Sequence, residues 1–160
     1  MTENDIIEFM AGLPGVVAFT AGEDNGAPQA AWGDSFFFYD PDDVPSNRKM
    51  PFATIVTKDY EGFDTASDLN RAGVFRLNIA VGRAVFEELL GYPPAAHDGR
   101  HEGVDYRVLD GILPHPVYAA QSWICVLNPG DATASHVRTL LTDAHTRAVA
   151  RRRPGARTGH

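Results

Sequence analysis

Cysteine is almost missing from this chain of 160 residues: Cys125 is the only one, so no intrachain disulfide can form. No apolar run approaches the ~20 residues that a membrane-spanning helix needs. The first five residues include Glu3 and Asp5 and no basic residue, whereas a signal peptide begins with basic residues. We therefore expect a cytoplasmic protein that is not associated with a membrane.

Catalytic signatures are missing too. The chain has no Gly-x-Ser-x-Gly elbow, no phosphate-binding loop and no dinucleotide-binding fingerprint. No cofactor is expected for these reasons. An enzymatic role stays open, because general acid–base catalysis needs only one well-placed Asp, Lys or His, and a sequence does not establish that placement.

Positive charge is scarce, and the formal net charge of -7 disfavours binding to a phosphate backbone. The arginines nevertheless crowd toward the C-terminus, at Arg147, Arg151, Arg152, Arg153 and Arg157. They can complement the dipole of a closing helix, or they can contact nucleic acid. We expect the first, and we expect residues 154–160 to form a disordered basic tail.

The composition that is present is that of one globular domain, which we place at residues 1–153. Its clearest element is a central stretch in which Leu77 and Ile79 alternate with Arg76 and Asn78. A period of two predicts a strand with one apolar face, here over residues 73–81. The apolar residues then change to helical spacing, which predicts a middle helix over residues 82–91.

Other elements follow from spacing and turn residues. A first helix is expected before Pro14, and a long closing helix is expected from Thr133 to about residue 153. Strands are expected at residues 16–21, 29–39, 52–58 and 122–127, with a hairpin turn at residues 24–26 and a short helix over residues 106–113.

Several stretches resemble one family. They are residues 31–41 (AWGDSFFFYDP), 51–60 (PFATIVTKDY), 62–67 (GFDTAS), 73–79 (GVFRLNI) and 114–119 (PHPVYA), with Trp123 and residues 126–129 (VLNP). Together they resemble the actinobacterial domain-of-unknown-function (DUF) family 6194, from about residue 3 to residue 152. This resemblance implies no activity and no catalytic residues.

A looser likeness is to the MmcQ/YjbR-like proteins. It is carried by residues 115–118 (HPVY), by the segment from Trp123 to residue 127, and by the closing helix. This resemblance implies a single α+β domain, whose curved and mainly antiparallel sheet of about five strands carries the N-terminal, middle and C-terminal helices on one face. DNA binding has been proposed for those proteins, but this chain lacks their basic character.

A candidate ligand site lies on the polar side of the predicted sheet. Arg76 and Asn78 share the face opposite the apolar one, and Trp32 and Asp34 occupy alternate positions of another predicted strand. An arginine with an amide and aromatic groups suits a small polar or anionic ligand in a sheet concavity. The alternative is an ion pair that, with polar strand residues, only stabilises the sheet.

Further candidates flank these strands. Lys58 ends a predicted strand and begins a loop with Tyr60 and Asp64, a position where sites are often built. Tyr118 and Trp123 add aromatic rings near the site. His115 lies between two prolines, where it either caps a backbone carbonyl or contributes to the site.

His97 and His101 are four residues apart and would share one face of a helix, as two metal ligands can. Gly99 and the preceding prolines argue against a helix, so no metal is expected. Two other functions stay open beside ligand binding. One is a protein-interaction module that forms a homodimer through exposed aromatic residues, and the other is DNA binding through the arginine-rich end.

Overall fold

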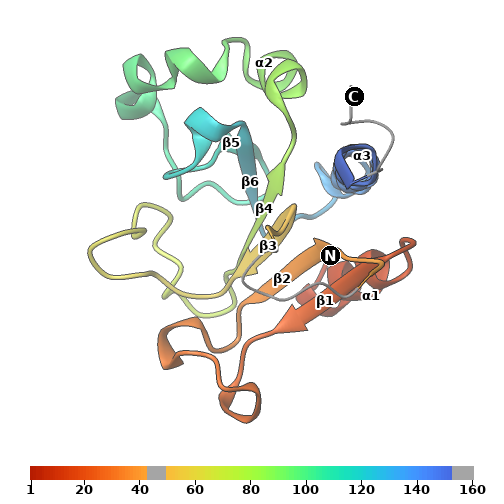
Figure 1. The fold of residues 1–160 in the computed structure, drawn as a ribbon. Helices are drawn as coiled ribbons and strands as arrows, with labels where there is room; N and C mark the ends of the chain where they lie inside the picture. Colours follow the sequence, from red (N-terminus) through yellow and green to blue (C-terminus); the bar gives the residue numbers. More distant parts are fainter. Residues whose placement is uncertain (43–49, 153–160) are drawn as a thin grey trace.

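One open antiparallel sheet organises the part of the chain that the structure, a computed structural model, describes, namely residues 1–42 and 50–152. Within these residues six strands pair in the order β1-β2-β3-β4-β6-β5 (Figure 1). The strands are β1 (Val16–Thr20), β2 (Ser35–Tyr39), β3 (Ala53–Val56), β4 (Arg76–Ala80), β5 (Ile112–Pro114) and β6 (Trp123–Leu127). The predicted tail, residues 154–160, lies outside the described residues, as do Arg153 and Arg157.

Three α-helices accompany the sheet within the described ranges: α1 (Glu3–Ala11), α2 (Arg83–Leu90) and α3 (Ala134–Arg152). Short 3-10 helices occupy the connections; they are η1 (Glu23–Asn25), η2 (Gln29–Ala31), η4 (Pro94–Gly99), η5 (His101–Gly103) and η6 (Ala119–Gln121). None of the helices in the described part of the chain combines the length and the apolar character that crossing a membrane requires.

The α-helices all pack on one face of the sheet. The sheet side chains that point to them alternate along each strand, as Leu77 and Ile79 do on β4. The helices contribute Ile6 and Met10 from α1, Phe86 from α2, and Val137, Leu140, Leu141, Ala144 and Ala148 from α3. Figure 1 shows α1 and α3 on one side of the sheet, and the long loop between β3 and β4 on the other. The predicted α+β fold is thus confirmed.

The strand predicted over residues 29–39 is shorter than expected. Residues 29–31 form η2, and the chain then turns at Gly33, whose φ of +92° is a left-handed value that favours glycine. The amide of Gly33 donates to the carbonyl of Ala21, which closes the loop between β1 and β2. Trp32 therefore lies in this loop and not in a strand.

The helix predicted over residues 106–113 is wrong. Residues 112–114 form β5, which pairs with β6 and adds an edge strand that the sequence did not indicate. Asp110 has a φ of +55°, so a right-handed helix cannot pass through it. Its carboxylate accepts hydrogen bonds from the amides of Gly130 and Thr133, just before α3. This tertiary contact overrides the helical spacing.

Candidate functional site

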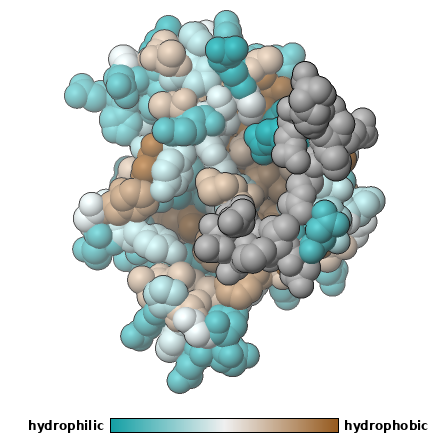
Figure 2. Space-filling view, in the orientation of Figure 1, coloured by the Kyte–Doolittle hydropathy of each residue, from teal (hydrophilic) through white to brown (hydrophobic). Residues whose placement is uncertain are grey.

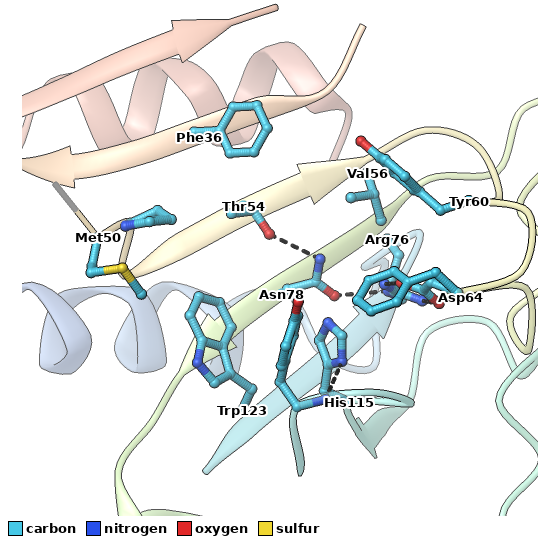
Figure 3. Close-up of a pocket in the computed structure, with 13 residues that line it drawn as sticks. Phe36, Met50, Thr54, Val56, Tyr60, Asp64, Arg76, Asn78, His115 and Trp123 are labelled. Carbon is cyan, nitrogen blue, oxygen red and sulfur yellow. Dashed lines mark hydrogen bonds and ion pairs between the residues drawn. The ribbon is translucent and has the colours of Figure 1, made fainter. Parts of the chain in front are cut away.

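The face of the sheet opposite the α-helices carries a pocket of about 390 Å³. Strands β2, β3, β4 and β6 contribute to it, together with the loop after β3 and the segment after β5 (Figure 3). The residues that line it are Phe36, Met50, Pro51, Thr54, Val56, Tyr60, Phe63, Asp64, Arg76, Asn78, His115, Tyr118 and Trp123. In the space-filling view, hydrophobic residues are recessed near the middle of the visible face, between hydrophilic residues above and below (Figure 2).

The floor of the pocket is built on Arg76, whose side chain is fully buried. Its two terminal nitrogens donate to the two carboxylate oxygens of Asp64, at 3.1 and 2.6 Å, so the ion pair is bidentate. The guanidinium group also donates to Ser67 Oγ at 2.9 Å and to Asn78 Oδ1 at 2.8 Å. These bonds use four of its five N–H donors and compensate its charge locally.

Asp64 reaches Arg76 because the loop after β3 folds back on itself. The backbones of Tyr60 and Asp64 exchange two hydrogen bonds of 2.9 and 2.8 Å around a turn that contains Gly62. Gly62 has a φ of +75°, which glycine adopts without the steric cost of a Cβ atom. The turn therefore fixes the carboxylate over the sheet.

A row of side chains in register crosses the sheet beneath the pocket. Phe36 on β2 pairs with Thr54 on β3, which pairs with Asn78 on β4 and so with Cys125 on β6. The amide orientation of Asn78 follows from its neighbour: Arg76 only donates, so the oxygen faces Arg76 and the nitrogen donates to Thr54 Oγ1 at 2.9 Å.

His115 is 3% exposed and stands at the edge of this floor. Its Nδ1 atom accepts from the amides of Val117 and Tyr118 at 3.0 and 2.9 Å, so the histidine caps backbone amides instead of a carbonyl. Because Nδ1 accepts, the proton of the neutral ring is on Nε2. Burial, and then the charge of Arg76, lower the pKa of His115 to about 3, so the ring is neutral at physiological pH.

Aromatic rings form the walls. Phe63 and Tyr118 contact each other with ring centroids 6.2 Å apart, and His115 lies 5.0 Å from Tyr118 and 6.3 Å from Trp123. The mouth is apolar and exposed: Met50 is 83%, Phe63 58% and Tyr118 42% accessible to solvent. The pocket therefore combines apolar walls with a polar floor.

Behind one wall lies a second polar cluster. The hydroxyl of Tyr60 donates to the buried carboxylate of Asp34, which also accepts from Thr57 N at 2.8 Å and Thr57 Oγ1 at 2.9 Å. Lys58 Nζ is 3.8 Å from Asp34 and donates to the carbonyl of Trp32. Burial, followed by the contact with Asp34, raises the pKa of Tyr60, so this phenol stays protonated.

The structure thus divides the eight sequence candidates into two groups. The pocket is lined by Arg76, Asn78, His115, Tyr118 and Trp123, whereas Trp32, Asp34 and Lys58 belong to the cluster behind Tyr60. Sequence reasoning placed Tyr60 and Asp64 in a loop that often carries sites, but it did not pair Asp64 with Arg76.

Other lining residues were missed. Phe36 and Thr54 could have been found from the alternation of side chains along their strands, if the register between the strands had been known. Met50 and Phe63 lie in loops, and no pattern in the sequence pointed to them. The thiol of Cys125 lies under the floor, where burial raises its pKa to about 12, so it is not a nucleophile at neutral pH.

His97 and His101, the two histidines considered as metal ligands, form hydrogen bonds with tyrosine hydroxyls. Tyr92 OH lies 3.0 Å from His97 Nδ1, and Tyr106 OH lies 3.2 Å from His97 Nε2 and 2.7 Å from His101 Nδ1. Among residues 1–42 and 50–152, no group of three or more His, Cys, Asp or Glu side chains is placed to hold a metal ion.

Fold and pocket together define a class: an α+β domain with an open antiparallel sheet, covered by helices on one face and hollowed on the other. The chain belongs to DUF6194, a family of unknown function, because the family model matches residues 1–157. This match confirms the family resemblance seen in the sequence motifs. Neither a curated protein nor a solved structure matches the chain.

Proposed function

We propose that this protein binds a small organic molecule in the pocket, with an apolar body between the aromatic walls and a polar head on the floor. The observation that carries the proposal is the buried Arg76–Asp64 pair beside His115, at the bottom of an apolar-walled hollow. A buried ion pair is weak evidence for stability, because desolvation offsets its attraction. The pair does, however, hold polar groups rigidly where a ligand can meet them.

The dimensions support the same proposal. Ligand pockets in proteins commonly enclose about 300–1,000 Å³ and are mostly apolar with a few convergent polar groups. The pocket has a volume of about 390 Å³, with Trp123, Tyr118 and Phe63 around the floor groups. A molecule of one or two rings fits that volume.

Binding is favoured over catalysis by the state of the titratable groups. The pKa of His115 is lowered to about 3, and burial raises the pKa of Tyr60 above its ordinary value. Efficient general acids and bases have pKa values near the working pH, and both groups have been moved away from it. The pocket therefore has the character of a binding site.

A thermal-shift screen with aromatic fragments, followed by NMR titration of the hits, tests the proposal. A fragment at ten times its Kd stabilises the folded state by about 1.4 kcal/mol, which is roughly 3–6 °C for a chain of this size. The variant Tyr118→Ala removes one exposed wall of the pocket and should weaken binding. The matched control is Val108→Ala, because Val108 is similarly exposed, at 43%, but does not line the pocket.

A second function, a homodimeric interaction module, is favoured by the exposed apolar mouth. Met50, Phe63 and Tyr118 together offer an apolar surface that a second copy can cover. Light scattering should then report a dimer, and Phe63→Ser should convert it to a monomer. A monomer at high concentration would leave ligand binding as the better account.

A further inference from the structure

The floor of the pocket carries no net charge. Of the described residues that line it, only Arg76 and Asp64 carry a charge, and they pair bidentately. His115 is neutral for a geometric reason: its Nδ1 atom accepts two amide hydrogens, so it has no room for a proton of its own. An anion that enters such a pocket loses its hydration and finds no uncompensated cation among the described residues that line it.

The acceptor atoms of the floor face the guanidinium group of Arg76. Both carboxylate oxygens of Asp64 and the amide oxygen of Asn78 accept from Arg76. The hydroxyl of Tyr60 is turned toward Asp34, to which it donates. A cationic ligand that approaches these oxygens therefore also approaches the positive charge of Arg76.

Donors, in contrast, are available. The Nε2–H group of His115 has no hydrogen-bond partner among the residues that the structure describes, and the residue as a whole is 3% exposed. Asn78 uses one amide hydrogen on Thr54 and has a second, and the Thr54 hydroxyl, which accepts that bond, still has its own hydrogen. In Figure 3 the ring of His115 points toward the floor formed by Asn78 and Arg76.

The geometry points to a specific head group: the pocket selects an uncharged hydrogen-bond acceptor, such as the carbonyl of an aromatic amide, lactam or ketone, over the corresponding carboxylate. The Nε2–H of His115 is the principal donor to it, and the Arg76–Asp64 pair excludes the anion by being neutral as a unit. This inference rests on the proposed function, because it assigns the ligand class of the same pocket.

Matched amide and acid pairs test it. Indole-3-carboxamide against indole-3-carboxylate, and benzamide against benzoate, differ in charge but hardly in shape. Each is titrated into the ¹⁵N-labelled chain of 160 residues at pH 7 and 150 mM salt, with the indole resonance of Trp123 as the reporter. We expect the amide of each pair to bind at least about fivefold more tightly than the acid.

Two variants separate the roles of the floor residues. His115→Asn keeps an oxygen that can accept the two amide hydrogens but lacks the Nε2–H donor, so amide affinity should fall at least about fivefold. Asp64→Asn leaves the charge of Arg76 uncompensated, so the preference should reverse toward the carboxylate. If Asp64→Asn does not fold, the wild-type ratio and His115→Asn decide the question.

The outcomes are distinct. Carboxylates that bind more tightly than amides to the wild-type protein would overturn the inference and leave the proposed function intact. If the variant His115→Asn bound the amides as tightly as the wild type does, His115 would not be the donor, and the inference would also be overturned. If neither member of either pair shifts pocket resonances at millimolar concentration, the proposed binding function fails with it.

Discussion

The stability of this protein should decline in mild acid because of one buried side chain. Protonated His115 would place a second positive charge near Arg76 and would force Nδ1 to release two backbone amides. Burial of the ring, and then the charge of Arg76, lower the pKa of this histidine from an ordinary 6.5 to about 3. A lowered pKa in the folded state means that the stabilisation is complete above pH 6.5 and is lost as the pH falls toward 3.

The size of the effect follows from the pKa of the unfolded chain. Each pH unit below about 6.5 lowers the free energy of unfolding by about 1.4 kcal/mol, as long as His115 stays neutral in the folded protein. At pH 5 the loss is therefore about 2 kcal/mol. This figure hardly depends on the folded-state pKa, provided that it lies below about 4.

The comparison is wild type against His115→Asn. Asparagine at this position can accept the same two amide hydrogens through its side-chain oxygen, and it does not titrate. Urea unfolding, followed by tryptophan fluorescence between pH 5 and 7.5, gives the free energy of unfolding of both proteins. The wild type should lose about 2 kcal/mol more than the variant over this range.

In the difference between the two proteins, the contributions of the other titrating groups to the pH dependence cancel. His97, whose pKa is also lowered by burial, contributes equally to both proteins. If the two pH profiles are parallel within about 0.5 kcal/mol, His115 protonates in the folded state without penalty, and its place as a buried, uncharged donor is refuted.

Two further predictions concern the ion pair and two glycines in separate turns. Asp64→Asn should lower the free energy of unfolding by about 3–5 kcal/mol in urea titrations, because it leaves Arg76 buried without a counter-charge; a loss below about 1 kcal/mol would show that the pair is not desolvated. Gly15→Ala and Gly62→Ala should each cost about 1 kcal/mol, because φ is +74° and +75°. Gly15→Ala should cost about 1–3 kcal/mol more, since its Cβ would lie 2.5 Å from the ring of Tyr39, whereas nothing lies within 4 Å at Gly62; equal losses would contradict this steric reasoning.

The sequence predicted the sheet best where the pattern was local. Alternation over β4 placed Arg76 and Asn78 opposite the helix-covered face, because side chains of a strand alternate strictly between its faces. It failed at Asp110, whose left-handed backbone and contact with Thr133 depend on residues distant in the chain. The spacing of apolar residues alone does not reveal such a contact.

The candidate site was predicted in part for the same reason. His115 and Trp123 were found because they lie in or beside elements that the motifs mark, and both line the pocket. The partnership of Arg76 with Asp64 was not found, because it depends on how the loop after β3 folds back, and loop geometry follows from tertiary contacts. Whether these residues bind a ligand stays a prediction.

The two-sided character of β4 has a consequence for how insertions are tolerated. Four consecutive residues of this strand are buried, and polar and apolar ones alternate among them. A shift of one residue in the register of β4 would point the guanidinium group of Arg76 into the apolar core beneath α3. It would also move Leu77 out of that core. A single residue inserted within β4 should consequently abolish folding.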